Sequence, residues 1–410
     1  MAMDYFKLPQ AYPDETWYSL ITRYHRKTGN YRYATSKQEL FGEGNQLLGV
    51  NPLGVDQTIR LYYQEHGPTH GSIEECITHF TLAPYYLRYF TAARKKEIIK
   101  EYVDMEQKNI PRIFGSYDGG RKNAYLRFCP YCFTEDIAKY GEAYWHRSHQ
   151  LWLADTCEKH GIPLQNSRVT VDYASYHLTC ADENTCEKID LNEMSKSNES
   201  ILNLTAYANA ALFAPFSFSE EPTVDALING AIDNGYGSYK SSGFACKSMA
   251  LQTDMCKVFP PASMAYNIAK ECNSTTLSRI FNPRRDNRVE AALLIAAFFQ
   301  LDREKLFEKS NRYQYILDVL HSCSTKGMAW DKSALAHFLG VKESLLPELA
   351  RAAGVAPCWG KLNRDLAIRP YIRVSKDEYA LMERRKKELF AYDMGEYIRY
   401  CIYKDIKEKR

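Results

Sequence analysis

Three cysteines and one histidine are the residues of this chain most clearly suited to chemistry. They form two close pairs, Cys129-Pro-Tyr-Cys132 and Cys157-Glu-Lys-His160, and two residues separate the members of each pair. Zn²⁺ prefers thiolate and imidazole ligands in a tetrahedron, and one tight turn can supply two of them at this spacing. Because four protein ligands leave no open coordination position, we predict one structural zinc site that folds a small module.

The 24 residues between the two pairs are enough for a hairpin or a short helix that brings the pairs together. Pro130 and Gly161 suit tight turns at the two pairs. The alternative is that these are buried thiols without a metal. Cys180 and Cys186, together with His177, form a weaker second cluster, because a five-residue gap is loose for zinc. A second zinc site there is doubtful.

Two further histidines, His146 and His149, lie between the zinc pairs. Histidine beside a metal can act as a general base, so a zinc-dependent nuclease is one hypothesis for this chain. We see no cluster of carboxylates near them in the sequence for a catalytic divalent ion. We therefore favour a packing role for Tyr144 and Trp145, and Arg147 is a candidate phosphate contact. We predict no catalytic residue in this chain.

The elements that position these residues are mainly helical, and we predict a mainly α, multidomain fold. Residues 1–118 should form a helical domain, since Trp17, Leu20, Ile21 and Tyr24 line one face of a helix that Gly29-Asn30 ends. Residues 119–190 should hold the zinc module, with a strand in 168–176 after the second ligand pair. Residues 191–325 should be a helical middle domain, in which 289–299 is a helix buried on several sides.

Residues 326–366 fit a helix-turn-helix. Gly340 makes the turn, small Ala336 permits close helix crossing, and leucines on both sides supply a shared core. Ser344 is a candidate cap of the second helix, which leaves Pro347 in its first turn. Lys342 and Ser344 are candidate DNA contacts. An αα-hairpin without DNA contact explains the same pattern.

Residues 367–410 are predicted to form a strand followed by two helices. Ser375 with Glu378 and Asp393 with Glu396 are two capping boxes. The order resembles the ribbon-helix-helix family, in which strands from two chains enter the major groove, so Tyr371 and Arg373 would face DNA in a homodimer. A helical tail is the alternative.

Composition argues against several classes of protein. Hydrophobic residues make up 45% and charged residues 25% of the chain, as in ordinary globular proteins. The longest apolar run, 291–299, is too short to span a bilayer, and the first residues do not resemble a signal peptide. Twelve cysteines in 410 residues are too dilute for a disulfide scaffold. We expect a cytoplasmic protein without a membrane partner.

A net charge of +3 indicates no global attraction to nucleic acid, so any DNA surface must be local. The basic clusters considered for it include Arg121 with Lys122, and Arg284 and Arg285 with Arg288. Solvated helix faces are the alternative explanation.

Several segments together resemble the TniQ/TnsD family of transposon target-selection proteins. Ala11-Tyr12-Pro13-Asp14-Glu15 with 18–25 resembles its opening helix, and Thr81-Leu82-Ala83-Pro84-Tyr85-Tyr86 its next landmark. The most specific signature is Arg127-Phe128-Cys129-Pro130-Tyr131-Cys132, then Gly141-Glu142-Ala143-Tyr144-Trp145-His146-Arg147, then Cys157-Glu158-Lys159-His160-Gly161. Leu151-Trp152-Leu153 departs from the Leu-Pro-Gly of many relatives, and a second knuckle of close cysteine pairs is absent from the sequence, as in the TnsD branch.

The resemblance implies a non-catalytic recruiter. Such a protein recognises an attachment site on double-stranded DNA and brings an AAA+ transposition regulator, which in turn brings the transposase. Some relatives instead dock on a CRISPR RNA-guided complex. The helix-turn-helix and the basic strand favour direct reading of DNA, because sequence specificity requires side chains at base edges.

Overall fold

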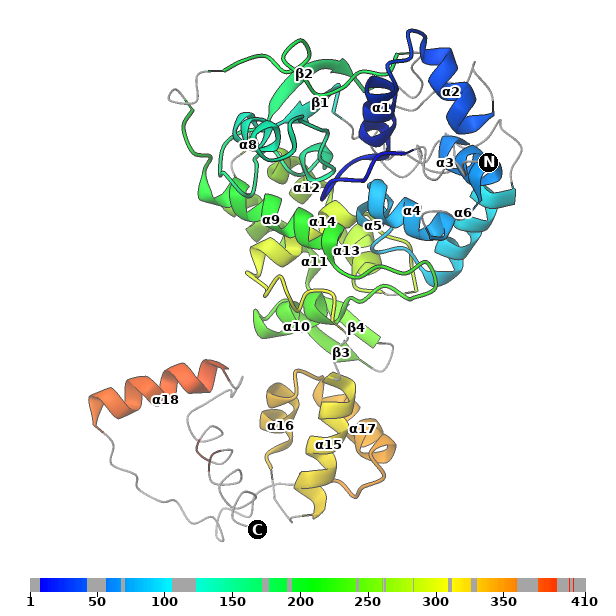
Figure 1. Cartoon of the computed structure of the whole chain (residues 1–410). Helices are drawn as coiled ribbons and strands as arrows, with labels where there is room; N and C mark the ends of the chain where they lie inside the picture. Colours follow the sequence, from blue (N-terminus) through cyan, green and yellow to red (C-terminus); the bar gives the residue numbers. More distant parts are fainter. Residues whose placement is uncertain are drawn as a thin grey trace, which may run out of the picture. The chain divides into compact units, whose positions relative to one another are not determined.

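The computed structural model describes most of the chain as a mainly α-helical protein (Figure 1). The described residues are 8–42, 57–67, 71–104, 123–171, 177–189, 194–240, 243–259, 261, 263–282, 284–308, 312–325, 330–359, 375–388, 398 and 401. The predicted strand residues Tyr371 and Arg373, the basic pair Arg121 and Lys122, and the second capping box at Asp393 lie outside them.

The described chain forms two compact units. The first comprises 1–223, 255–272 and 282–307, and the second comprises 224–254, 273–281 and 308–410. The predicted N-terminal domain and zinc module, 1–118 and 119–190, therefore fall within one compact unit. None of the described helices is long and apolar enough to cross a membrane.

The first unit contains most of the helices and one short sheet. Its elements are α1 (Trp17–Thr28), α2 (Tyr33–Phe41), α3 (Gln57–His66), α4 (Ile73–Phe80), α5 (Ala83–Tyr86), α6 (Ala92–Asp104), β1 (Tyr125–Phe128), α8 (Pro130–Tyr140), η1 (Ser148–Gln150), β2 (Gln165–Thr170), α9 (Glu199–Phe213), α12 (Met264–Glu271) and α14 (Val289–Phe298). Strands β1 and β2 pair antiparallel, with Phe128 opposite Gln165.

Helix α1 begins and ends where its sequence predicts. The Thr16 hydroxyl accepts a hydrogen bond from the Ser19 amide, which caps the first turn. Gly29 ends the helix in the left-handed conformation at φ 68°, which costs glycine little because it has no Cβ. Trp17 and Ile21 are buried on the face that the spacing predicts.

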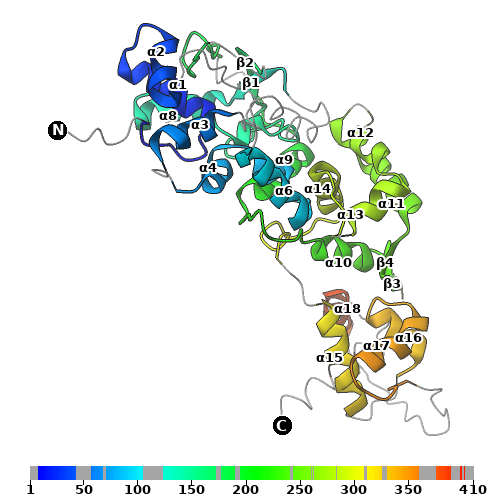
Figure 2. The same cartoon turned by 90° about the vertical axis from the view of Figure 1, so that its right-hand side faces the viewer.

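Helix α14 is the centre of the first unit's core. All eight residues from Val289 to Ala296 are buried, because α14 packs against both α9 and α12. Figures 1 and 2 show α9 and α14 side by side from two directions. The prediction that 289–299 is a helix buried on several sides is confirmed.

The second unit joins a hairpin and two helices to a C-terminal helical core. Its elements are α10 (Asp225–Asp233), β3 (Gly237–Lys240), β4 (Gly243–Cys246), α13 (Ser274–Ile280), α15 (Arg312–Thr325), α16 (Lys332–Phe338), η3 (Glu343–Leu345), α17 (Leu346–Ala352) and α18 (Lys376–Glu388). Helix α11 (Ser248–Val258) is divided between the two units. Strands β3 and β4 pair antiparallel.

Helices α15, α16 and α17 share one apolar core. Leu320 of α15, Leu335 of α16 and Leu346 of α17 are each fully buried in it. Gly340 turns the chain between α16 and η3 at φ 66°. Two helices joined by a turn lie at the predicted place, as both a helix-turn-helix and an αα-hairpin require. The predicted cap is wrong: Ser344 lies in η3, and α17 has Leu345 at its N-cap without a side-chain cap.

Helix α18 is the described part of the C-terminal segment. Its start carries the predicted capping box, because the Glu378 amide donates to the Ser375 hydroxyl at 3.2 Å and the Ser375 amide donates to the Glu378 carboxylate at 2.7 Å. The Ser375 amide and the Ser375 hydroxyl both donate to the Glu378 carboxylate, and these hydrogen bonds lower the pKa of Glu378. The local prediction is confirmed, while the paired strands of a ribbon-helix-helix would lie outside the described residues.

Candidate metal centre and the adjoining histidine pocket

The four predicted ligands come from two turns of the first unit. Cys129 follows β1 directly and stands at the N-cap of α8, with Pro130 at the first helical position, where its missing amide hydrogen is tolerated. The second turn is closed by hydrogen bonds from the Gly161 amide to the Cys157 carbonyl, at 2.7 Å, and from the Cys157 amide to the Ile162 carbonyl, at 2.8 Å. Gly161 has φ 68°.

The ligand atoms of the two turns converge on one point. Nδ1 of His160 lies 3.4 Å from Sγ of Cys129, 3.4 Å from Sγ of Cys132 and 3.5 Å from Sγ of Cys157. Sγ of Cys132 and Sγ of Cys157 are 3.7 Å apart. A tetrahedral zinc ion would place two sulfurs about 3.7 Å apart and a sulfur and a nitrogen about 3.5 Å apart. The donor set therefore fits one tetrahedral metal ion.

Two neighbours hold the His160 ring in place. Nε2 of His160 lies 3.2 Å from a carboxylate oxygen of Glu135, and the ring of Tyr131 stacks on the imidazole with centroids 5.2 Å apart. A carboxylate on the second ring nitrogen directs the first nitrogen toward the metal position. Glu135 also pairs with Lys159, which lowers the pKa of this carboxyl group. Glu135 is three residues after Cys132 on α8, a helical spacing from which it could have been predicted.

The structure offers no second metal site within its described residues. The cluster of Cys129, Cys132, Cys157 and His160 is the one group of three or more ligand side chains found there. Cys180 and Cys186 are buried separately from it, and burial raises the pKa of Cys186 to about 12.

His146 lies between two carboxylates that the sequence interpretation missed. Its Nε2 atom is 2.8 Å from Oδ2 of Asp136, and its Nδ1 atom is 3.8 Å from Oδ2 of Asp14. Burial lowers the pKa of His146, but the hydrogen bonds to Asp136 and Asp14 outweigh burial and raise the pKa to about 9. Two single carboxylates therefore lie beside His146, although the described residues hold no carboxylate cluster of the kind that a catalytic divalent ion would need. Asp136 is four residues after Cys132 on α8, and Asp14 comes from a distant segment.

The protonated state of His146 bears on the nuclease hypothesis. An imidazolium whose two nitrogens both face carboxylates has no free lone pair to take a proton from water. His149 is buried at 5% exposure, and burial lowers its pKa. The geometry of His146 thus favours a structural role over that of a general base.

Arg147 is held inside the first unit. Its side chain is only 8% exposed, its Nη1 atom donates to the Thr78 carbonyl at 2.8 Å, and its Nε atom lies 3.3 Å from a carboxylate oxygen of Asp14. Reaching a phosphate would require breaking these contacts and exposing Asp14. Arg147 therefore has a structural role that joins α4 to the metal module, and the phosphate contact expected of it stays a prediction.

The packing role predicted for the neighbouring aromatic residues is confirmed. Trp145 is fully buried, and its indole nitrogen donates to the Thr179 carbonyl at 3.1 Å. Tyr144 is 6% exposed, and its hydroxyl donates to the Pro13 carbonyl at 2.9 Å. Both residues join the opening segment of the chain to the metal module.

A buried ion-pair network joins the same two segments. Arg23 is 1% exposed and contacts Glu15 at 2.6 Å and Glu142 at 2.9 Å. Burial alone would raise the pKa of Glu142. Hydrogen bonds from Arg23, Arg26 and Lys27 outweigh burial and lower this pKa to about 2. Arg23, Glu15 and Glu142 lie in the sequence segments that carry the family resemblance, but only the fold shows that they pair.

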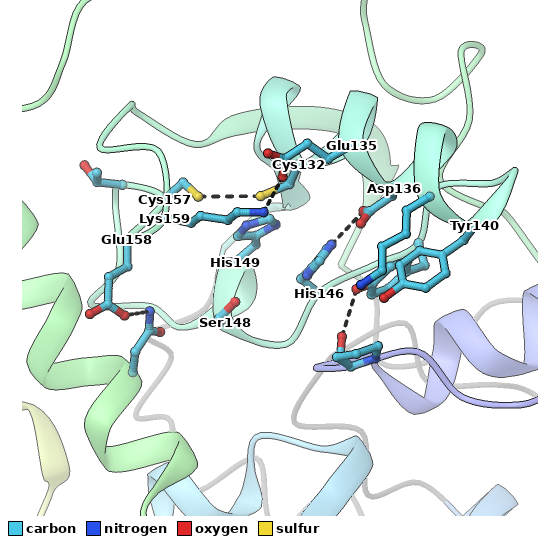
Figure 3. Close-up of a pocket in the computed structure, with 15 residues that line it drawn as sticks. Cys132, Glu135, Asp136, Tyr140, His146, Ser148, His149, Cys157, Glu158 and Lys159 are labelled. Atoms are coloured by element: carbon cyan, nitrogen blue, oxygen red, sulfur yellow. Dashed lines mark hydrogen bonds and ion pairs between the residues drawn. The ribbon is translucent and has the colours of Figure 1, made fainter. Parts of the chain in front are cut away.

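A pocket of about 430 Å³ lies beside the metal centre (Figure 3). Figure 3 shows Glu158 at one end and Tyr140 at the other, with the Asp136–His146 pair and the metal-ligand side chain Cys157 in the wall. The wall also includes Asn209 of α9. The sequence offered no signal for this pocket, because its residues come from segments spread over about 200 positions.

The predicted DNA contacts that the structure describes are exposed, with the exception of Arg147. In the first unit, the stretch before α14 holds Arg284, Arg285 and Arg288. In the second unit, Lys342 directly precedes η3, and Ser344 lies within it. The three arginines thus belong to the first unit, and Lys342 and Ser344 belong to the second.

Two comparisons with known proteins found a match. Residues 8–164 match the TniQ family. A segment of 169 residues is 27% identical to the transposon Tn7 transposition protein TnsD of Escherichia coli. That match covers 40% of this chain and 32% of the relative, so the similarity spans about a third of the length of the relative.

Proposed function

Because this chain belongs to the TniQ/TnsD family through its TniQ domain at 8–164, we propose that it selects target sites for a transposon. It binds a discrete attachment site on double-stranded DNA, and it recruits an AAA+ ATPase regulator that in turn brings the transposase. The single observation that carries this proposal is the TniQ match, which includes all four metal-ligand residues and the Arg23 network.

We propose Zn²⁺ as the ion of the metal centre. Three thiols and one imidazole match the ligand preference of zinc, and their distances match its tetrahedron. Bound there, zinc supplies a cross-link between the two turns. The residues of the chain supply the rest of the module: Glu135 orients His160, and the Arg23 and His146 networks attach the module to the opening segment.

A non-catalytic role is consistent with these side chains. The metal centre uses four protein ligands, so a bound ion would have no open position for water. His146 carries its proton at neutral pH and is engaged on both nitrogens. We therefore propose a recruiter and disfavour a zinc-dependent nuclease.

Direct DNA reading is proposed for the second unit. Two short helices on a shared core with a tight turn between them are the arrangement in which a helix-turn-helix presents its second helix to the major groove. Lys342 and Ser344 are exposed near the start of that second helix, the end that contacts bases in such proteins. Arg284, Arg285 and Arg288 are proposed to contact phosphates, with Arg121, Lys122, Tyr371 and Arg373 as further candidates outside the described residues.

The proposal is tested with the full chain and genomic DNA of its host. Fragments retained by the protein are sequenced, and an enriched fragment is footprinted at two salt concentrations. We expect one protected duplex site, with affinity that falls steeply as salt rises. A scattered set of fragments without a protected site would contradict direct reading.

The absence of a protected site would favour the alternative function, that of an adaptor that links a CRISPR RNA-guided complex to the transposition machinery. It would be recognised by co-purification of the chain with a guide-RNA complex. We place both activities in the cytoplasm, at the nucleoid. The homodimer is proposed from the ribbon-helix-helix resemblance and would appear as twice the mass of 47.3 kDa in light scattering.

A further inference from the structure

The pocket beside the metal centre has a polar end with an unused acceptor. Asn209 is 7% exposed and lies in the pocket wall. Its Nδ2 atom donates to Oε2 of Glu158 at 2.6 Å, which fixes the orientation of the amide. Its Oδ1 atom is buried and has no hydrogen-bond partner among the residues that the structure describes. A buried carbonyl oxygen without a donor costs about 1–3 kcal/mol, so this atom suits a ligand that donates a hydrogen bond.

The charge of this end selects the class of ligand. The Glu158 carboxylate lies beside the Asn209 amide and pairs only loosely with Arg303, at 3.5 Å between Nη1 and Oε1. Two acceptors at one end would repel a phosphate group and attract a cation that carries several N–H donors. A phosphate is therefore a poor fit for this end of the pocket, whereas a guanidinium or ammonium group can donate to both oxygens. The lining cation Lys139 lies by the other end, with Nζ 4.8 Å from the centroid of the Tyr140 ring.

The rest of the pocket suits the remainder of a peptide. Its volume of about 430 Å³ falls in the range of about 300–1,000 Å³ that is typical of ligand pockets. Tyr140 lines the end away from Glu158 (Figure 3), and the ring of Tyr144, also in the lining, lies 6.0 Å from the Tyr140 ring, so both offer aromatic surface. The His146 imidazolium and Lys159 already pair with Asp136 and Glu135, which leaves Glu158 as the acid with the weakest partner.

We propose that this pocket binds an arginine or lysine side chain of a protein partner, with Asn209 Oδ1 and the Glu158 carboxylate as its acceptors. The partner is the AAA+ regulator, so the identity of the partner rests on the proposed function, while the chemistry of the pocket does not. The inference adds to that function a contact point in the first unit, whereas DNA reading is proposed for the second unit.

The chemistry is tested on the full chain with two short peptides, acetyl-Gly-Arg-Gly-amide and its uncharged citrulline analogue. Saturation-transfer NMR should show binding of the arginine peptide about tenfold tighter than the citrulline peptide, the size expected for one charge-assisted hydrogen bond. Asn209→Leu and Glu158→Gln should each remove the difference. Glu304→Gln changes the same charge outside the pocket and should leave it intact.

Equal binding of the two peptides, or binding that persists in both pocket variants, would overturn the proposal. Thermal melting and metal content show whether Asn209→Leu is folded. If Asn209→Leu is not folded, the Glu158→Gln variant decides the test, because it changes an exposed side chain.

The partner is tested with the purified AAA+ ATPase of the same transposon. Asn209→Leu and Glu158→Gln should weaken its binding about tenfold and leave DNA protection unchanged. If the unmodified chain fails to bind the ATPase, the recruitment part of the proposed function is wrong and the peptide experiment alone decides the pocket. If the unmodified chain and both variants bind the ATPase equally, the proposed contact is wrong and the function stands.

Discussion

Nε2 of His146 lies 2.8 Å from Oδ2 of Asp136, and this contact joins the loop after α8 to the helix that carries the metal ligand Cys132. The second nitrogen of the same ring faces Asp14, which belongs to the opening segment. One imidazolium thus bridges two carboxylates from segments more than 100 residues apart. Its proton is part of what holds the TniQ domain together.

The stability of the domain should therefore depend on the proton of His146. The pKa of His146 is about 9 in the folded chain, above its ordinary value of 6.5. Its stabilisation is fully present below about pH 6.5 and is lost as pH rises through 9. The shift corresponds to about 3 kcal/mol at most. The melting temperature of the unmodified chain should fall from pH 6 to pH 10. The difference between this melting temperature and that of His146→Asn should shrink over the same range. A difference that is constant over this range would contradict the proposed charge.

Metal binding should require each of the four ligands. Cys132→Ser should lower the metal content from about one ion per chain to near zero and make 123–171 sensitive to protease, because a structural metal contributes directly to folding. Elemental analysis and limited proteolysis measure the two effects. Cys256→Ser, which changes a half-buried thiol outside the cluster, is the matched control. Full metal content in Cys132→Ser would exclude the proposed ligand set.

Glu135 should tune the metal affinity without binding the metal. Its carboxylate orients His160 from 3.2 Å, so Glu135→Gln should weaken metal affinity by about 10- to 100-fold. Competition with a chromogenic chelator measures the change. Glu183→Gln, an exposed acid in the same part of the chain, should have no effect. An unchanged affinity in Glu135→Gln would mean that the tertiary packing alone orients the ring.

Breaking the buried ion pair at Arg23 should be costly. Arg23→Met leaves the buried Glu15 carboxylate without its cation, and we expect a loss of about 3–5 kcal/mol in the free energy of unfolding. Removing the carboxylate as well, in Arg23→Met with Glu15→Gln, should recover part of that loss, since no uncompensated charge is then buried. Denaturant unfolding of both variants measures the recovery. A double variant no more stable than the single one would show that Arg23 stabilises the fold mainly through its packing on Tyr12.

DNA affinity should depend on Lys342 through a charge contact. If Lys342 contacts a phosphate, Lys342→Ala should weaken binding to every sequence about equally and reduce the slope of log affinity against log salt by about 0.9. If it contacts a base, the loss should fall on the specific site. Titrations of specific and random duplexes at several salt concentrations separate the two. Lys305→Ala, an exposed lysine before α15, is the control, and equal affinities for Lys342→Ala and the unmodified chain would remove Lys342 from the interface.

The metal-ligand cluster and the opening helix were predictable because each depends on contacts between residues close in the sequence. Two-residue spacing places Cys129 beside Cys132, and a Thr16 cap and Gly29 limit α1. The capping box at Ser375 and Glu378 spans three residues. Such local geometry follows from backbone dimensions and side-chain chemistry, whatever the rest of the chain does.

The roles of His146, Arg147 and Asn209 were decided only in three dimensions. The sequence shows a histidine near a metal and an arginine among polar residues, and both patterns suggest surface chemistry. Folding brings Asp14 to His146, the Thr78 carbonyl to Arg147, and Glu158 to Asn209. The physical reason is that charge and hydrogen bonding depend on distance and burial, and neither is encoded in spacing along the chain once the partners lie tens of residues apart.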